Sequence, residues 1–258
     1  MGWTDAHDRS VTLVPSASES ARFGHPVERL TVGAGWTESM SREQLGSRLR
    51  DLATGSTATT IILRYPAQAN FVVTELGGVN REVYPAGSLL YWERDTAGQS
   101  ADPAVSLLDQ PLAPLVAAEA LAVIADSFEG YVNHYHANPL IEETAVTEGY
   151  LEWAGNSLVA DTGKVFVVRD GDEIAGVATI DASEPGYWEI LLAGMATSAQ
   201  GKGLYLRLVR GVLAAAAEVG VPRVLISTQT HNIAVQRAWA KLGFSPVAAV
   251  ETVHLVSA

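Results

Sequence analysis

The stretch from Glu189 to Glu218 constrains the fold most, because it joins a strand to a helix through a short turn that contains two glycines. The apolar run up to Thr197 predicts a strand. Beyond the turn, apolar residues recur at spacings i, i+3, i+4, i+7, i+8 and i+11, at Tyr205, Leu208, Val209, Val212, Leu213 and Ala216. This pattern predicts a helix over about 203–218 that buries one face against a sheet.

Patterns on both sides of this stretch predict more helices and strands. Apolar periodicity predicts further helices at about 112–127, 144–159 and 232–242. Alternating or continuous apolar runs predict strands at about 165–169, 174–182, 187–197, 223–228 and 247–256. Three strands in succession indicate an antiparallel meander, and the β-α-β continuation adds a parallel pair. The expected fold class is therefore α+β, with a mixed sheet flanked by helices.

A polar segment suggests a boundary between two regions of the chain. Residues 95–103 read DTAGQSADP, which is rich in turn formers and has no large apolar side chain. We therefore expect an N-terminal α/β region at 1–95, a linker at 96–103 and a second region at 104–258.

The N-terminal region contains an internal echo of the second region. After a strand expected at 59–63, an apolar helix pattern ends in Leu-Gly, and the same spacing recurs 166 positions later. The matched positions are Ala69, Val72, Val73, Leu76 and Gly77 in the first copy, and Val235, Ala238, Trp239, Leu242 and Gly243 in the second. A chance match and a degenerate second copy of one half-fold both explain this echo.

Composition and charge exclude several function classes. The chain has 17 basic and 29 acidic residues, a net charge of −12, which opposes binding to nucleic acid or to an anionic membrane. With no cysteine and only six scattered histidines, no metal centre is expected. Residues 1–20 lack the apolar run of a signal peptide, so we expect a cytoplasmic protein. A homodimer is compatible with the sequence, which does not fix the oligomeric state.

The glycine-bearing turn has the chemistry of a phosphate site. A strand, a glycine turn and a helix present backbone N–H groups and the positive end of the helix dipole to an anion. Gly201 and Gly203 allow close approach of the backbone, and Lys202 adds a positive charge. The alternative is that the turn only connects the strand to the helix.

Together with a second motif, this turn resembles the GNAT superfamily of acyl-CoA N-acyltransferases. The second motif is Asn232 followed by Trp239 and by Leu242-Gly243-Phe244. The resemblance covers about 104–258 and implies acetyl-CoA as co-substrate and a strand that diverges from its neighbour beside the thioester. The implied coenzyme-binding residues are Met195, Thr197, Gln200, Gly201, Lys202, Gly203, Tyr205, Asn232 and Trp239. Tyr205 departs from the family pattern, which has glycine or alanine at this position.

Within the superfamily, the chain is similar to the branch that contains TDP-fucosamine N-acetyltransferase. The similarity is carried by Phe23-Gly24, by SFEGYVNHYHANP at 127–139 with Tyr150 and Trp153, and by STQTHNIAVQRAWAKLGF at 227–244. It implies a degenerate half-GNAT-like α/β region before the catalytic one, and transfer of an acetyl group to the amine of a nucleotide-linked amino sugar. The implied acceptor-binding residues are Asn133, His134, Tyr135 and Asn138.

Amide formation requires a proton acceptor for the amine and a proton donor for the departing thiolate. Many GNAT enzymes place a tyrosine acid seven residues after the motif asparagine, but that position is Trp239, whose indole cannot act as an acid. Tyr205, His231 and His254 are the alternative acids, although the spacing of Tyr205 also suits packing.

Glu189 is the first candidate base, because strand alternation places it on one face with Leu191, Ala193 and Met195. The alternatives are the pair His134 and His136, and an exposed strand-end carboxylate with no catalytic role. Three functions stay open at this point: acetyl transfer to an amino sugar nucleotide, acyl transfer to another small amine in specialised metabolism, and acyl-CoA binding without turnover. The acidic balance favours a cationic acceptor.

Overall fold

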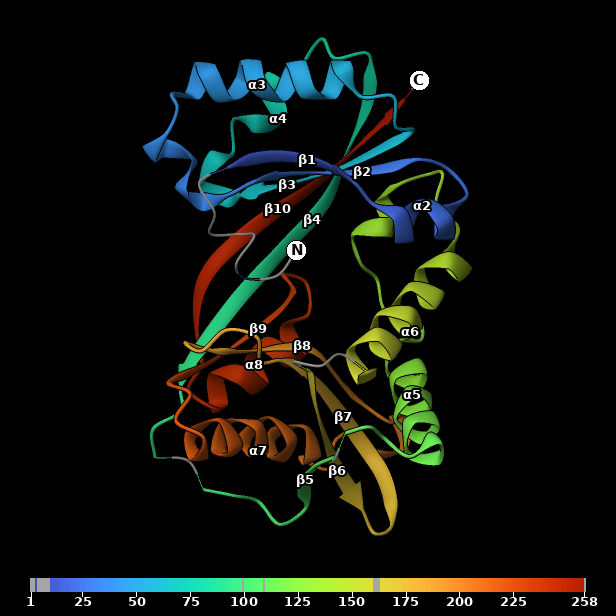
Figure 1. The fold of residues 1–258 in the computed structure, drawn as a ribbon, viewed down its shortest axis with the longest axis vertical. Helices are drawn as coiled ribbons and strands as arrows, with labels where there is room; N and C mark the ends of the chain where they lie inside the picture. Colours follow the sequence, from blue (N-terminus) through green and yellow to red (C-terminus); the bar gives the residue numbers. More distant parts are fainter. Residues whose placement is uncertain (1–2, 4–9, 99, 109, 160–162, 258) are drawn as a thin grey trace. The chain divides into compact units, whose positions relative to one another are not determined.

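The computed structural model describes residues 3, 10–98, 100–108, 110–159 and 163–257. Position 99 of the expected linker and most of the first nine residues lie outside this part of the chain. The chain forms two compact units. Unit 1 comprises Met1–Leu90, Val132–Val146 and Ala248–Ala258, and unit 2 comprises Tyr91–Tyr131 and Thr147–Val247. Two strands, β4 (Arg81–Asp95) and β10 (Ser245–Ser257), contribute residues to both units (Figure 1).

Unit 2 contains a mixed sheet flanked by helices. Its strands are β5 (Val105–Leu107), β6 (Gly163–Asp170), β7 (Glu173–Asp181), β8 (Trp188–Met195) and β9 (Arg223–Gln229). Its helices are α5 (Pro114–Phe128), most of α6 (Glu143–Val159), α7 (Leu204–Glu218) and α8 (Ile233–Lys241). Strands β5 to β8 pair antiparallel in chain order, and β8 pairs parallel with β9. The predicted α+β fold, with a mixed sheet flanked by helices, is confirmed, and the predicted elements of this part lie within a few residues of the observed ones.

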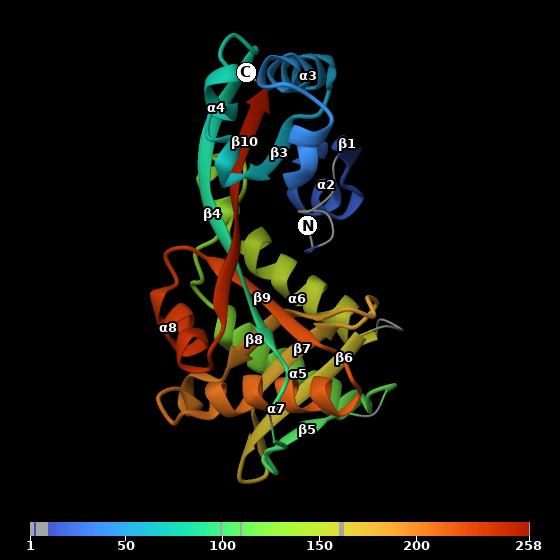
Figure 2. The same ribbon diagram turned by 90° about the vertical axis from the view of Figure 1, so that its left-hand side faces the viewer.

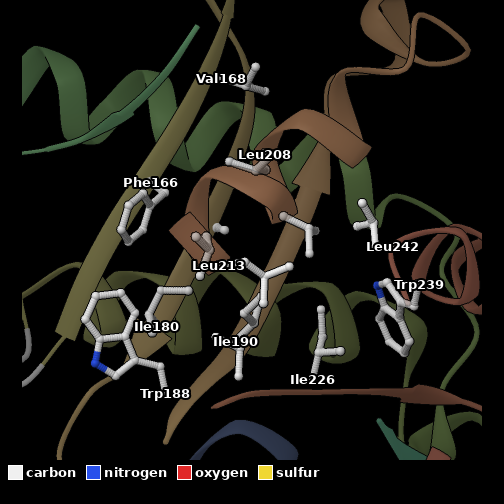
Figure 3. Close-up of a cluster of buried hydrophobic side chains, with 14 of the residues drawn as sticks. Phe166, Val168, Ile180, Trp188, Ile190, Leu208, Leu213, Ile226, Trp239 and Leu242 are labelled. Atoms are coloured by element: carbon white, nitrogen blue, oxygen red, sulfur yellow. The ribbon is translucent and has the colours of Figure 1, made fainter. Parts of the chain in front are cut away.

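Alternating residues of the central strands supply two separate cores. Phe166 and Val168 of β6 face α7 and pack with its residues Leu208 and Leu213 (Figure 3). The intervening residues of β6 face the opposite way and pack with α5 and α6. Strands buried on both faces need an almost continuous apolar sequence, and β6 and β7 have one. The sheet is therefore a central layer between α7 and the α5–α6 pair.

Unit 1 is a second α/β layer. Its elements are β1 (Val11–Pro15), α2 (Ala17–Phe23), β2 (Val27–Val32), the 3-10 turn η1 (Ala34–Glu38), α3 (Arg42–Gly55), β3 (Thr60–Pro66), the 3-10 turn η2 (Ala67–Ala69) and α4 (Val72–Glu75). β1 and β2 pair antiparallel, β2 and β3 parallel, and β3 pairs antiparallel with β10. Leu45 and Leu49 of α3 pack on Leu30 and Leu63 of the sheet, and Figure 2 shows α3 beside these strands.

The observed units differ from the expected contiguous regions. Val132–Val146 and Ala248–Ala258 belong to unit 1, although the sequence placed both in the second region. The expected linker is also held to unit 2: Thr96 Oγ1 donates to Val221 O at 2.7 Å, and Arg207 donates to both Asp102 oxygens at 2.7 and 2.8 Å. Its polar composition therefore serves specific hydrogen bonds. Whether 1–95 and 104–258 act as folding domains stays a prediction.

A chain of three hydrogen-bonded side chains, of which the two histidines are buried, anchors the 132–146 segment within unit 1. Arg64 Nη2 lies 3.0 Å from His134 Nε2, and His134 Nδ1 lies 2.9 Å from His254 Nε2. Because a guanidinium can only donate, His134 must accept at Nε2 and carry its proton on Nδ1. That proton is donated to His254 Nε2, so His254 in turn carries its proton on Nδ1. Both histidines are therefore neutral in this arrangement.

An ion pair between the partly exposed Arg29 and the buried Glu19 holds the same segment. Arg29 donates to both oxygens of Glu19 at 2.7 and 2.9 Å, and the Tyr135 hydroxyl donates to Glu19 Oε1. Burial acts to raise the pKa of Glu19, but the hydrogen bonds and charge of Arg29 outweigh it and lower that pKa to about 2. Asn138 adds a hydrogen bond from Nδ2 to Thr60 Oγ1 at 3.2 Å.

The histidine chain predicts a loss of stability in mild acid. Burial first, and the charge of Arg64 second, lower the pKa of His254 to about 4, and burial lowers the pKa of His134 in the same direction. The unfolded chain binds these protons near pH 6.5. The free energy of unfolding therefore falls as pH is lowered from about 6.5 to about 4. We expect the urea midpoint to fall across this window and His254→Gln to make the dependence shallower. His231→Gln, at an exposed histidine, is the control, and an unchanged slope in His254→Gln would contradict this account.

The shared strand β10 predicts that residues 104–258 do not fold alone as stably as in the full chain. Val250–Val256 pair with β3, and Val253 and Leu255 are buried in the core of unit 1. A fragment without β3 exposes this apolar strand edge, which favours aggregation. We expect a lower melting temperature by circular dichroism and association in size-exclusion chromatography. A monomeric fragment as stable as the full chain would refute the prediction.

Candidate functional site

The turn between β8 and α7 has the backbone that an anion site requires. Gly201 and Gly203 both have φ of +76°, a conformation that strains other residues, and residues 201–203 are exposed. Gly203 is the N-cap of α7, and no side chain caps the helix there. The first turn of a fifteen-residue helix thus presents its N–H groups and its positive dipole end beside an accessible glycine turn.

Two polar residues of the motif flank this turn. Lys202 Nζ lies 2.7 Å from Asp170 Oδ2, and both side chains are about half exposed. An exposed ion pair of this kind contributes about 0–1 kcal/mol, so a phosphate can replace the carboxylate at little cost. Gln200 ends the short 3-10 turn η4 (Thr197–Ala199) in an extended conformation that leads into the glycines.

The parallel strands β8 and β9 separate toward this turn. Their register joins Trp188, Glu189 and Ile190 to Val224, Leu225 and Ile226, whereas β8 continues to Met195 and β9 to Gln229. The pairing thus stops five residues before the end of β8. This separation is the one that the family resemblance implies for the strand beside the thioester.

The backbone at the end of β8 places one N–H group on the edge that faces the separation. Ala196 N donates to Ala175 O at 2.9 Å, so its N–H is directed toward β7. Successive N–H groups of a strand alternate in direction, so that of Met195 is directed away from β7. It donates to Ser127 Oγ at 3.2 Å. Next to it, Thr197 donates from N and Oγ1 to Asp126, at 2.6 and 3.0 Å.

A β-bulge in β8 corrects the expected position of Glu189. Ile180 pairs with Ile190 and Thr179 with Leu192, so Leu191 has no partner on β7. The bulge reverses the alternation, and the expectation that Glu189 shares a face with Ala193 and Met195 is wrong. Glu189 pairs with Asp181 and lies on the α5 face, the face of Leu192 and Gly194, with only 6% of its surface exposed.

The buried Trp239 and the partly buried Tyr205 form a hydrogen-bonded pair. Trp239 is 1% exposed within the core that faces α7 (Figure 3), and its Nε1 donates to Tyr205 Oη at 2.9 Å. Burial raises the pKa of Tyr205, so its phenol stays neutral and is a weak acid. The position of Trp239 supports packing rather than coenzyme contact. The hydrogen bond from the indole N–H also fixes the position of the Tyr205 hydroxyl.

Asn232 caps α8 and joins a polar group that the sequence did not reveal. Its Oδ1 accepts from Val235 N at 3.4 Å, and its Nδ2 donates to Thr228 Oγ1 at 3.2 Å. Tyr131 Oη lies 3.3 Å from the same Thr228 oxygen. In the sequence, Ser127 and Tyr131 are marked as candidate site residues by one feature, their position in the stretch 127–139 that carries the family resemblance.

The structure divides the expected site residues between the two units. Glu189 and all the expected coenzyme-binding residues belong to unit 2, whereas His254 and the expected acceptor-binding residues belong to unit 1. His254 is 0% exposed and neutral, which argues against an acid role. Asn133, His134 and Asn138 are buried in hydrogen bonds within unit 1, so the structure gives them an anchoring role. Contact with an acceptor stays a prediction for all four residues.

Two further classes of feature are absent from the part of the chain that the structure describes. Among those residues, no group of three or more histidine, aspartate or glutamate side chains is arranged to hold a metal ion. Nor does any helix there combine the length and apolarity that a bilayer crossing requires.

Comparison with known proteins supports the fold along most of the chain. Residues 127–244 match the family model "Acetyltransferase (GNAT) family". Similar solved structures include a GNAT-family protein from Novosphingobium aromaticivorans, with 18% identity over 89% of this chain and 84% of that one and a TM-score of 0.52. A GCN5-related N-acetyltransferase from Kribbella flavida has 15% identity over 90% and 81%, with a TM-score of 0.54. One from Sphaerobacter thermophilus has 12% identity over 90% and 73%, also at 0.54.

No curated protein is significantly similar to the chain in sequence. The three structures are too distant to indicate more than the fold, but they extend the likeness well beyond the matched segment. The glycine turn, α7, the separating strands and the Asn232 helix all lie inside that segment. Residues 127–244 of this chain are thus similar to the GNAT acetyltransferase family, and the solved structures show the same fold over most of the chain.

Proposed function

We propose that this protein is an acyl-CoA-dependent N-acyltransferase that uses acetyl-CoA to acetylate a small amine. The observation that carries the proposal is the uncapped start of α7 at Gly203, beside the separation of β8 from β9, within the family segment. A pyrophosphate suits the exposed N–H groups of the glycine turn, and an extended arm suits the edge of β8 beyond Ile190.

The residues of unit 2 divide into three roles in this proposal. Gly201, Lys202 and Gly203 hold the pyrophosphate, and Met195 N–H polarises the acyl carbonyl. Acetyl-CoA supplies the activated acyl group when bound. Glu189 accepts a proton from the acceptor amine, directly or through water, because its carboxylate is buried in an otherwise apolar strand.

The leaving thiolate has two routes in this proposal: protonation by Tyr205, or departure without an acid. Trp239 occupies the usual tyrosine position and lies in the core. Tyr205 is the alternative acid, because it has the same phenol group as the usual tyrosine. Its oxygen accepts a hydrogen bond from Trp239 Nε1, so the Tyr205 hydroxyl can donate its own proton to another group. A thiolate is stable enough in water near neutral pH to leave without a strong acid, as thiols have a pKa near 8.5.

For the acceptor, we propose the amine of a nucleotide-linked amino sugar. The support is the sequence similarity of the stretches 127–139 and 227–244 to the TDP-fucosamine branch. Another small amine is the alternative. A coenzyme A release assay over nucleotide amino sugars, free amino sugars, polyamines and amino acids decides between them. Coenzyme binding with no release on any amine would favour a binding module that lacks turnover.

Replacing Gly203 with valine should abolish most coenzyme A affinity. The side chain adds bulk where the backbone must approach the pyrophosphate, and φ of +76° strains any such residue. Gly171→Val is the matched control, because Gly171 has φ of +65° in a turn with similarly open space. We expect both variants to lose about 1–2 kcal/mol of stability. Only Gly203→Val should weaken binding in calorimetry, and equal affinity in both variants would remove the turn from the site.

Replacing Glu189 with glutamine should lower turnover while leaving coenzyme A affinity unchanged. The loss should shrink as pH rises, because the acceptor amine then deprotonates without help. Glu173→Gln, at an exposed glutamate that begins β7, is the control. The measurement is the pH profile of kcat and kcat/KM. A profile in Glu189→Gln that parallels the wild-type one would assign Glu189 a structural role.

A further inference from the structure

The side chain of Ser127 lies against the one residue of β8 whose backbone is proposed to meet the acyl group. Ser127 is the next-to-last residue of α5, and its Oγ accepts the hydrogen bond from Met195 N at 3.2 Å. Beside it, Asp126 receives both hydrogen bonds of Thr197, at 2.6 and 3.0 Å. Two successive side chains at the end of α5 therefore fasten this helix to the end of β8.

An independent observation shows that β8 is shaped to admit Ser127. A Cβ atom on Gly194 would lie 2.5 Å from Ser127 Oγ and 2.7 Å from Ser127 Cβ. Any larger residue at this position would therefore displace the serine. Glycine inside a strand costs about 0.5–1 kcal/mol relative to alanine and often marks a close approach. Gly194 has no positive φ, so the space taken by Ser127 is the reason for glycine here.

The Ser127 hydroxyl can donate a hydrogen bond at this position. An oxygen that accepts a hydrogen bond from Met195 keeps its own proton for donation. Met195 N and Ser127 Oγ are 3.2 Å apart, so one oxygen atom can lie within hydrogen-bond distance of both. The Met195 N–H is directed to the edge where β8 has separated from β9.

We propose that Ser127 is a second oxyanion donor, which acts with Met195 N–H on the carbonyl oxygen of the acyl group. This inference rests on the proposed function. When the carbonyl arrives, Met195 N–H transfers its hydrogen bond from Ser127 to the carbonyl oxygen, and the Ser127 hydroxyl donates to the same oxygen. As the amine adds to the carbonyl carbon, negative charge moves to this oxygen, and both donors stabilise it. Asp126 is a positioning residue, because its bonds to Thr197 hold the end of α5 in place.

The decisive readout is the vibrational frequency of the bound carbonyl. Acetyl-CoA labelled with ¹³C at the carbonyl is bound to wild type, Ser127→Ala and Ser157→Ala, and isotope-edited infrared spectra are compared. Ser157→Ala is the matched control, because it removes a buried helical serine hydroxyl that donates to Trp153 O. We expect the carbonyl band of Ser127→Ala at higher frequency than that of wild type and of Ser157→Ala. Coenzyme A affinity should stay the same in all three proteins, since this ligand has no acyl group.

Kinetics supply the second readout. Loss of one oxyanion donor should lower kcat of Ser127→Ala about 100-fold. The KM for acetyl-CoA should stay within about twofold of wild type, as expected for a hydrogen bond that is weak to the bound carbonyl and strengthens as charge develops in the transition state. Gly194→Ala, which keeps the hydroxyl but displaces it, should change the band and kcat in the same direction. An unchanged band or an unchanged kcat in Ser127→Ala, with acetyl-CoA bound, would overturn the role of Ser127 alone. Failure of wild type to bind acetyl-CoA would overturn the proposed function itself.

Discussion

The burial of one face of α7 on the sheet of unit 2 determines where the candidate site forms. The stripe through Leu208 and Leu213 packs on Phe166, Ile180 and Ile190, and a buried stripe fixes the rotation of a helix about its axis as well as its position. Once α7 is fixed, its first turn must follow the end of β8 after only a few residues. The two glycines with positive φ make that short connection possible. The exposed N–H groups at Gly203 are therefore a consequence of core packing, and the ligand chemistry uses a feature that the fold already requires.

Two glycines and a β-bulge, features that destabilise strands, lie around the end of β8, with Gly176 in the neighbouring strand β7. A Cβ on Gly176 would lie 2.3 Å from Met195 Sδ, so this glycine admits the Met195 side chain on the α7 face. Gly194 admits Ser127 on the opposite face, and the bulge at Leu191 brings Glu189 to that same face. Each feature costs strand stability and would be unfavourable in a strand with only a structural role. Their concentration within a few residues of Met195 is the strongest structural argument that this segment is functional.

Local patterns predicted most of unit 2 and little of unit 1. Strand and helix periodicity identified every helix of unit 2, because each buries a regular face. In unit 1, β1, β2 and α3 were missed, although the capping box of Ser41 and Gln44 and the spacing of Leu45 and Leu49 signal α3. Other features were beyond any local pattern. The bulge depends on pairing with β7, and the place of the 132–146 segment in unit 1 depends on a contact between His134 and His254, 120 residues apart. The polar residues of that segment predict a ligand site, and the structure adds that Asn133, His134 and Asn138 are buried and hydrogen-bonded, a property that sequence does not reveal.

The chain topology gives physical meaning to the sequence echo between 69–77 and 235–243. The strand after the first copy, β4, begins in unit 1 and ends in unit 2, where β9 is its neighbour in strand order. The strand after the second copy, β10, begins in unit 2 and ends in unit 1, where it pairs with β3. The two β-α-β segments thus exchange their last strands, and each unit is completed by a strand from the other copy. A degenerate second copy would give this reciprocal arrangement, and a common origin of the two segments stays a prediction. In the first segment Val72 and Leu76 are buried, as Trp239 and Leu242 are in the second, but α4 has four residues against nine in α8, so the two helices are alike in their buried positions and not in length.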